Sequence, residues 1–163
     1  MKNIAVFAGS FDPFTNGHLD VLKKALKDFD EIVVLVMRNP QKDPFFSIGE
    51  RILIIREIIK DIPNVIVDTS QGYTVNYAHK HGCNTLIRGV RTEEDISHEK
   101  KLEEMNNSLR PSIRTVYYWT TLGLETVSST RIKADFINKK DISKYVSSIV
   151  IASLVKKLRI ESD

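Results

Sequence analysis

Glycine, hydroxyl and imidazole groups suited to phosphate binding are gathered near the start of the sequence, in "GSFDPFTNGH", residues 9–18. Gly9 and Ser10 follow an apolar run, whereas Gly17 and His18 fall in the first turn of an amphipathic helical pattern that begins near Gly17. Free backbone N–H groups and the positive end of the helix dipole make such a junction attractive to anions. The stretch therefore predicts an anion site, and phosphate is the anion that these groups suit.

His18 is the residue of this stretch that could act on a reacting group. The helix dipole disfavours a protonated imidazole in the first turn by about 0.3–1 kcal/mol, and a bound phosphate reverses that preference. The alternative is a solvated histidine that happens to begin a helix. Because Gly9, Ser10 and Gly17 lie close to it in the sequence, we expect that His18 contacts phosphate.

Two arginines elsewhere in the sequence could join the same site. Arg88 and Arg91 flank Gly89 in "IRGVR", after another apolar run. Two guanidinium groups beside a backbone that a ligand can approach closely would form a phosphate clamp. The alternative is that both arginines lie on the surface and pair with the acidic residues at positions 93–95.

A loop and a run of hydroxyl groups complete the candidate set. In "RNPQKDPFF", residues 38–46, two prolines flank Lys42, which indicates an ordered but movable loop that could carry the ammonium group over the site. An ordinary exposed lysine is the alternative. In "VSST", residues 127–130, one hydroxyl would cap a following helix in any protein, and three in succession would also suit phosphate oxygens.

The secondary-structure pattern gives these candidates a common location. Continuous β-branched apolar runs predict strands buried on both faces of a parallel sheet, at residues 4–8, 31–37, 64–68, 84–88 and 114–119. Helical patterns occur at about residues 17–29, 47–61, 73–81, 93–110, 128–138 and 144–159. The alternation predicts a single α/β domain, residues 1–163, with a doubly wound five-stranded parallel sheet. Ligands of such sheets bind beyond the carboxyl ends of the strands, which is where the candidate residues occur.

Composition narrows the class of protein. Lys and Arg number 24 against 21 Asp and Glu, mixed along the chain, which suits small anionic ligands and gives no strong case for a nucleic-acid or membrane partner. The single cysteine, Cys83, excludes an intramolecular disulfide, and we expect it to be buried and unreactive. The chain enters a strand pattern at once, without a leader or an apolar run of about 18 residues, so we expect a cytoplasmic protein.

The candidate residues favour phosphoryl chemistry that needs no covalent enzyme intermediate. No serine or cysteine is paired with a base in a recognisable arrangement, and no carboxylate cluster or P-loop is present, so any Mg²⁺ would arrive on a nucleotide. What remains is positioning and cationic stabilisation by His18, Lys42, Arg88 and Arg91. A phosphate monoester with a pKa near about 6 is ionised at neutral pH and attacks without a general base. We therefore expect nucleotidyl transfer.

At this level of detail the sequence resembles a known family. "GSFDPFTNGH" resembles the T/HxGH signature of nucleotidyltransferases with a Rossmann-like fold. Over its whole length the chain resembles bacterial phosphopantetheine adenylyltransferases, with Lys42 in an "NPxK" context, "LIRGVR", Glu99, "MNNSLRP" and "VSST" in the family's order and spacing.

The resemblance implies transfer of AMP from ATP to 4'-phosphopantetheine, giving dephospho-coenzyme A and pyrophosphate, with Mg²⁺ bound to ATP. It implies that His18 stabilises the transition state at the α-phosphate and that Ser10 orients the attacking phosphate. Lys42 and Arg88 would hold that phosphate, and Thr74 would line the pantetheine arm.

The resemblance also assigns an ATP site, in which Arg91 acts on the reacting phosphates. Its implied members are Ser10, Phe11, His18, Gly89, Val90, Arg91, Glu99, Leu124, Glu125, Thr126, Val127, Ser128, Ser129 and Thr130. Members of the family are typically homohexamers inhibited by coenzyme A, and we expect the same here. His98, Leu124 and Thr126 replace aromatic residues that are usual in the family, which affects how the base and ribose pack.

Three other functions are alternatives to this one. Thr130 in "SSTRIK" also resembles nicotinate or nicotinamide mononucleotide adenylyltransferases, although the short chain, Lys42 and "RGVR" argue against them. A catalytically silent nucleotide-binding module would be free to lose His18 or Lys42, and both are present. A class I synthetase would need a longer chain and a second signature lysine motif.

Overall fold

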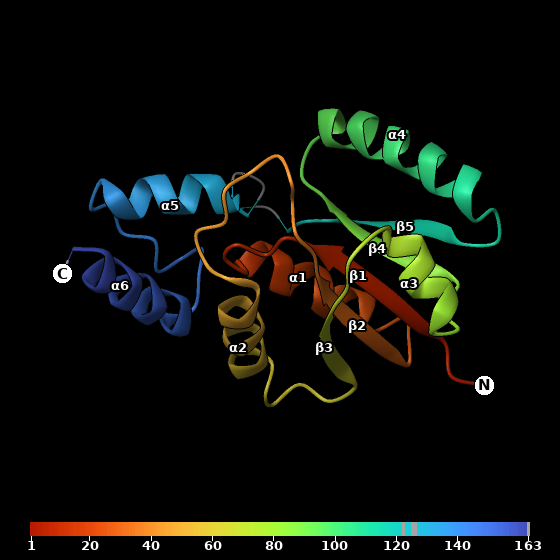
Figure 1. Ribbon diagram of the computed structural model, residues 1–163, viewed down its shortest axis with the longest axis horizontal. Helices are drawn as coiled ribbons and strands as arrows, with labels where there is room; N and C mark the ends of the chain where they lie inside the picture. Colours follow the sequence, from red (N-terminus) through yellow and green to blue (C-terminus); the bar gives the residue numbers. More distant parts are fainter. Residues whose placement is uncertain (122, 125–126, 163) are drawn as a thin grey trace.

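The apolar runs form a parallel sheet, because continuous β-branched strands are buried on both faces only when helices cover both. The protein is seen in a computed structural model that describes residues 1–121, 123–124 and 127–162. Within them the strands are β1 (Ile4–Gly9), β2 (Glu31–Val36), β3 (Val65–Thr69), β4 (Thr85–Val90) and β5 (Arg114–Trp119). Their order is β3-β2-β1-β4-β5, which confirms the predicted doubly wound α/β fold (Figure 1).

The helices follow the predicted segments with small shifts at their ends. They are α1 (Asn16–Ala25), α2 (Ile48–Ile58), α3 (Thr74–Lys80), α4 (Glu93–Leu109), α5 (Ser129–Ile137) and α6 (Ser148–Ser162). The last one begins later than predicted because the Ser147 hydroxyl accepts the backbone N–H of Val150, as an N-cap does. The first ends before Phe29 because tighter turns follow it, yet Phe29 remains in the core.

Two layers of helices cover the sheet. Helices α1 and α2 pack on one face, where Val21, Leu22 and Ile55 join the main core, and α3 packs on the other through Val75 and Ala78. Neighbouring tyrosines of β5 show the same division. The Tyr117 hydroxyl donates to Glu103 of α4, and the Tyr118 hydroxyl donates to Asp28 beyond α1, each at 2.7 Å.

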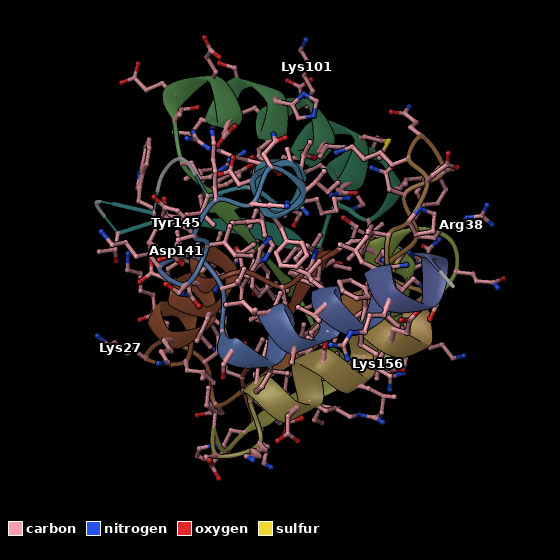
Figure 2. All side chains as sticks on the ribbon, turned by 90° about the vertical axis from the view of Figure 1, so that its left-hand side faces the viewer. Lys27, Arg38, Lys101, Asp141, Tyr145 and Lys156 are labelled. Carbon is pink, nitrogen blue, oxygen red and sulfur yellow. The ribbon has the colours of Figure 1, made fainter. Side chains whose placement is uncertain are left out.

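A third cluster joins the carboxyl-terminal helices to α2. Figure 2 shows α6 lying alongside α2, and buried Ile132 of α5 and Leu154 of α6 belong to the same cluster as Ile54 of α2. The Lys157 ammonium donates to Glu50 of α2 at 2.8 Å. Within the described residues, no helix combines the length and apolar character needed to cross a membrane. The prediction for Cys83 is confirmed, because it is buried and burial raises the pKa of its thiol.

The sheet opens where its strand order reverses. β1 pairs with β4 only from Ala5 to Phe7, although β1 continues to Gly9 and β4 to Val90. The carboxyl ends of the two central strands therefore diverge, and the Arg88 guanidinium donates to the carbonyl of Ala8 across the opening at 2.9 Å. This is the position at which doubly wound sheets bind ligands.

Candidate active site

A cavity of about 420 Å³, here called the main cavity, lies at the opening between β1 and β4. Most of the predicted site residues line it. They are Ser10, Phe11, His18, Lys42, Arg88, Gly89, Arg91, Glu99, Val127, Ser128, Ser129 and Thr130. The topology thus brings together four segments that are far apart in the sequence.

His18 is held in a single tautomer by the start of its own helix. Its Nδ1 accepts the backbone N–H of Thr15 at 2.9 Å, while the Thr15 hydroxyl accepts the backbone N–H of His18 at 3.3 Å. This is a capping box in which histidine takes the place of glutamate or glutamine. Because Nδ1 accepts, the ring proton lies on Nε2, which leaves that nitrogen to donate to a ligand.

The imidazole of His18 is uncharged in the free protein. The aromatic rings of Phe7, Phe11 and Phe14 lie around it, with ring centroids 6.4, 5.0 and 5.3 Å away. Burial first, and then the charges of Arg91 and Arg88, lower the pKa of His18 from 6.5 to about 3. In the free protein the group is therefore a neutral donor, and the cationic stabilisation expected of His18 beside a bound phosphate stays a prediction.

Arg88 is oriented by a paired hydrogen bond with Glu99 of α4. Its Nε and one terminal nitrogen each donate to a carboxylate oxygen at 2.8 Å, and the other terminal nitrogen donates to Ala8. A guanidinium has five N–H donors, so one on each terminal nitrogen remains for a ligand. Glu99 is 9% exposed, and both of its oxygens are used by Arg88. The structure therefore gives Glu99 the role of orienting Arg88.

Arg91 is less constrained than Arg88. Its Nε lies 3.5 Å from Asp95, whose carboxylate also accepts the backbone N–H of Arg91 at 3.0 Å. One terminal nitrogen reaches the carbonyl of Val127 at 3.4 Å. Of the two arginines, only Arg91 pairs within the acidic segment at residues 93–95, and its weaker contacts leave it able to turn toward an anion.

The hydroxyl groups before α5 are partly used by the fold. Ser128 accepts the backbone N–H of Arg131 at 3.2 Å as the N-cap of α5, and the Ser129 hydroxyl donates to the carbonyl of Pro13 at 2.8 Å. Ser128 retains its own proton for a ligand, whereas Ser129 retains only acceptor capacity. The first turn of α5 is thereby fixed against the loop that carries Ser10.

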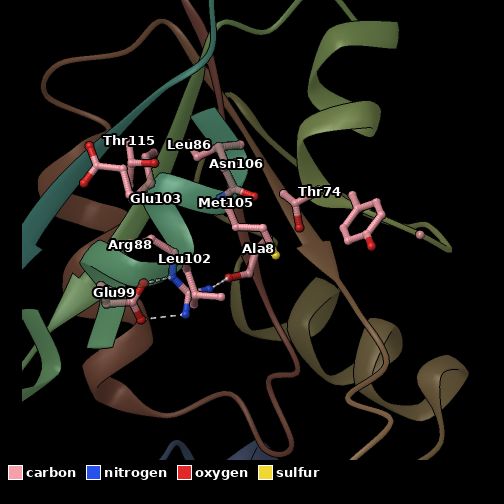
Figure 3. Close-up of a pocket in the computed structure, with 13 residues that line it drawn as sticks. Ala8, Thr74, Leu86, Arg88, Glu99, Leu102, Glu103, Met105, Asn106 and Thr115 are labelled. Carbon is pink, nitrogen blue, oxygen red and sulfur yellow. Dashed lines mark hydrogen bonds and ion pairs between the residues drawn. The ribbon is translucent and has the colours of Figure 1, made fainter. Parts of the chain in front are cut away.

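A second cavity, the side cavity, adjoins the main cavity. It measures about 170 Å³, and Ala8, Arg88 and Glu99 line both. Figure 3 shows the Arg88–Glu99 pair on one side and Thr74 of α3 on the other, and Leu102 and Met105 of α4 also line this cavity. The predicted substrate residue Thr74 therefore lies outside the main cavity, but in a space that meets it at Arg88.

Lys42 lies between the main cavity and a small basic recess of about 40 Å³. The recess is also lined by Ser10, Arg38, Arg51 and Lys133. Within the described residues the Lys42 ammonium has no hydrogen bond or ion pair, although its backbone N–H donates to Asn39 at 3.2 Å. The lysine is thus free to bind an incoming anion.

Comparison with known proteins places the chain in a family. A curated phosphopantetheine adenylyltransferase from Alkaliphilus metalliredigens (strain QYMF) is 37% identical over 154 residues, covering 94% of this chain and 98% of that relative. The chain belongs to the phosphopantetheine adenylyltransferase family. A family model described as cytidylyltransferase-like also matches residues 6–135.

Solved structures share the fold of this adenylyltransferase family member. A Vibrio parahaemolyticus protein provisionally assigned as a nicotinate-nucleotide adenylyltransferase superposes with a TM-score of 0.66 at 22% identity, covering 95% of this chain and 99% of that one. The lipopolysaccharide core biosynthesis protein of Thermoplasma volcanium GSS1 gives a TM-score of 0.55 at 23% identity, covering 74% of this chain and 98% of that one. These two matches bear on the fold alone.

Two residues expected at the ATP site do not line the main cavity, and the role expected of the Val90 backbone stays a prediction. Val90 is fully buried, and its carbonyl accepts the backbone N–H of Thr120 at 3.0 Å, while Leu124 packs against the cluster of α5 and α6. Neither lines the main cavity. The predictions for Glu125 and Thr126 lie outside the described residues.

Sequence reasoning did not assign the roles of three residues that line the main cavity. Thr15 caps α1, Asp95 holds Arg91, and Thr120 lines the cavity with its hydroxyl lacking a partner among the described residues. A threonine one residue before a helical pattern is a recognisable capping signal, so Thr15 could have been found. The contact of Thr120 depends on the pairing of β4 with β5.

Gly89 allows this family member to pack α1 close to β4. A Cβ at position 89 would lie 2.9 Å from Cγ2 of Val21, one turn beyond His18 on α1. We expect Gly89→Ala to lower the free energy of unfolding by about 1–3 kcal/mol through overpacking, and to lower kcat by displacing His18. Denaturant unfolding and steady-state assays would measure both. In the double variant Gly89→Ala/Val21→Ala the losses should be smaller than the sum of the single losses, and strictly additive losses would contradict the steric explanation.

Proposed function

We propose that this chain transfers AMP from ATP to the phosphate of 4'-phosphopantetheine, releasing pyrophosphate and forming dephospho-coenzyme A. One observation carries the proposal beyond family membership. Arg88 lies where the two cavities meet, oriented by Glu99 and with N–H donors to spare. It would hold the acceptor phosphate at this junction, with the nucleotide in the main cavity and the acceptor's arm in the side cavity.

The side cavity suits a slender acceptor arm that carries both apolar and polar groups, because its lining mixes the two kinds of side chain. Thr74 supplies a hydroxyl, while Leu102 and Met105 of α4 present apolar side chains that are partly exposed. Filling the cavity with such an arm would remove the apolar surfaces of Leu102 and Met105 from water. This shape supports phosphopantetheine as the acceptor.

The reaction we propose needs positioning and charge stabilisation. An oxygen of the acceptor phosphate attacks the α-phosphorus of ATP, and the bond from that phosphorus to the oxygen bridging to the β-phosphate breaks, so pyrophosphate leaves with the electron pair. Ser10, Lys42 and Arg88 would hold the attacking group. The acceptor is already ionised near neutral pH, so no side chain has to remove a proton.

His18 and the helix N-termini would act on the α-phosphate. Nε2–H of His18 would donate to a non-bridging oxygen whose charge grows in the transition state, as in an oxyanion hole. Arg91 and Ser128 would bind the departing phosphates, supported by the dipole of α5.

Magnesium remains a prediction for the nucleotide and is not assigned to protein ligands. Among the described residues, no group of three or more histidine, cysteine, aspartate or glutamate side chains is placed to hold a metal ion. We therefore propose that Mg²⁺ enters with ATP, and every step above is assigned to the chain's own groups. A homohexameric assembly, feedback inhibition by coenzyme A and a cytoplasmic location are further proposals, supported by the family resemblance.

Release of pyrophosphate with each acceptor tests the function. We expect the purified protein with ATP and Mg²⁺ to release pyrophosphate on addition of 4'-phosphopantetheine and to form dephospho-coenzyme A in equal amount. Nicotinate and nicotinamide mononucleotides, which lack a slender arm for the side cavity, should give at most background release. Turnover with a mononucleotide and none with phosphopantetheine would overturn the proposal.

A further inference from the structure

Arg51 of α2 is a buried cation outside the main cavity. Only 3% of it is exposed, and burial lowers the pKa of its guanidinium while the charge of Asp12 raises it. Its hydrogen bonds go to backbone carbonyls of three segments. One terminal nitrogen of Arg51 donates to the carbonyls of Ser10 at 2.7 Å and Met37 at 3.3 Å. Its Nε donates to the carbonyls of Phe46 at 3.0 Å and Ser47 at 3.3 Å.

These carbonyls place Arg51 at both ends of the loop that carries Lys42. Met37 precedes the loop and Phe46 ends it, while residues 40–44 between them are exposed. The same terminal nitrogen that reaches Met37 also binds Ser10, on the catalytic side. One guanidinium therefore fixes where the loop begins and ends relative to Ser10.

Asp12 also links the segment that contains Ser10 to the end of the Lys42 loop. It is 7% exposed, and its two carboxylate oxygens accept the backbone N–H groups of Phe45 and Phe46 at 2.7 and 2.8 Å. The Lys133 ammonium lies 3.8 Å from the same carboxylate. Because Asp12 belongs to the segment containing Ser10, it ties that segment to the end of the Lys42 loop.

We propose that Arg51, assisted by Asp12, is a positioning residue that sets Lys42 in register with Ser10 for binding of the acceptor phosphate. The proposal rests on the function proposed above. A planar guanidinium reaches carbonyls in several directions at once, whereas a lysine ammonium is a point charge on a flexible stem. Arg51→Lys should therefore keep the charge but lose the joint attachment of the loop and Ser10.

A double-mutant cycle between Arg51 and Lys42 tests this role. Arg51→Lys should raise the KM for 4'-phosphopantetheine about tenfold and leave the KM for ATP within about twofold, since one or two hydrogen bonds are lost. In a Lys42→Ala background the same substitution should change the KM for phosphopantetheine by less than about twofold, because the group being positioned is gone. Equal effects in both backgrounds would overturn the proposal.

Hydrogen exchange gives a readout that does not depend on the reaction. Amide exchange in residues 38–45 should become faster in Arg51→Lys and in Asp12→Asn, which removes the carboxylate charge from the same connection. Ile55→Val, a buried change one turn along α2, should leave exchange in this loop and the KM unaltered. Unchanged exchange in both Arg51→Lys and Asp12→Asn would overturn the inference. If the wild-type protein does not use phosphopantetheine, the proposed function fails, and the exchange data still decide the role of Arg51.

Discussion

His18→Gln should lower kcat by about 10²–10³-fold with little change in protein stability. The loss corresponds to removal of one preorganised donor to the transition state. Glutamine is a usual third residue of a capping box, so its side chain can accept the backbone N–H of Thr15 that His18 accepts now. Single-turnover assays and denaturant unfolding would measure the two properties separately.

Two comparison variants sharpen the test of His18. His18→Ala should lose activity similarly and also lose stability, because the backbone N–H of Thr15 then lacks its partner. His79→Ala, an exposed histidine on α3, should change neither property. Activity within about tenfold of the wild type in both His18→Gln and His18→Ala would contradict a donor role for Nε2, because alanine has no donor, whereas the glutamine amide retains N–H donors.

The lowered pKa of His18 predicts how the protein responds to acid. The unfolded chain takes up a proton on His18 near pH 6.5, whereas the folded chain does so only near pH 3. Protons therefore favour the unfolded state in this window, and the free energy of unfolding should fall as the pH is lowered from about 6.5 toward 3. His18→Gln should flatten that part of the stability curve.

The pH dependence of kcat/KM should also show that His18 is neutral near neutral pH. His18 stays neutral above about pH 5, so kcat/KM should show no inflection near pH 6.5 that belongs to this group. The acceptor's own ionisation near about pH 6 can give a limb, but that limb should persist in His18→Gln. An inflection that disappears with His18 would show that the imidazole titrates during catalysis.

Arg88→Lys should raise the KM for 4'-phosphopantetheine by about 10- to 100-fold. Lysine retains the charge but loses the paired contacts with Glu99 and the spare donors to phosphate, each charge-assisted hydrogen bond contributing roughly 1.5–3 kcal/mol. The KM for ATP should change much less. Steady-state kinetics with each substrate varied in turn would measure the difference.

The partner of Arg88 offers matched controls. Glu99→Gln should act in the same direction with a smaller effect, because an amide cannot accept two N–H groups in the same fork. The double variant Arg88→Met/Glu99→Leu removes both charges and should fold, since replacing both partners of an ion pair costs far less than removing one. It should nevertheless fail to bind phosphopantetheine, and normal binding by this folded variant would exclude Arg88 as the phosphate ligand.

The chain's local patterns were enough to predict the elements and the edge that carries the site. Continuous β-branched runs determine strands, and Ser47 and Glu50, three positions apart, form a capping box at the start of α2. Gly82 follows α3 with a φ of +70°, as expected of a helix-ending glycine. These features depend on residues three or four positions apart, so the sequence contains all the information they require. Because the carboxyl ends of parallel strands lie at the same edge of a sheet, the glycines, hydroxyls and cations that follow the strands lie together at that edge.

Tertiary structure alone decided what those residues are able to do. The neutral state of His18 comes from rings and charges brought around it by folding, and the orientation of Arg88 comes from Glu99 on the next helix. Arg51 shows most clearly what local sequence patterns do not predict. It recurs with Ile54 and Ile55 on the buried face of α2, but its carbonyl partners lie up to 41 positions away in the sequence. Desolvation and hydrogen-bond partners are properties of the folded interior. The sequence by itself therefore determined at which edge of the sheet the site lies. Tertiary packing determined the charge state and the orientation of each group.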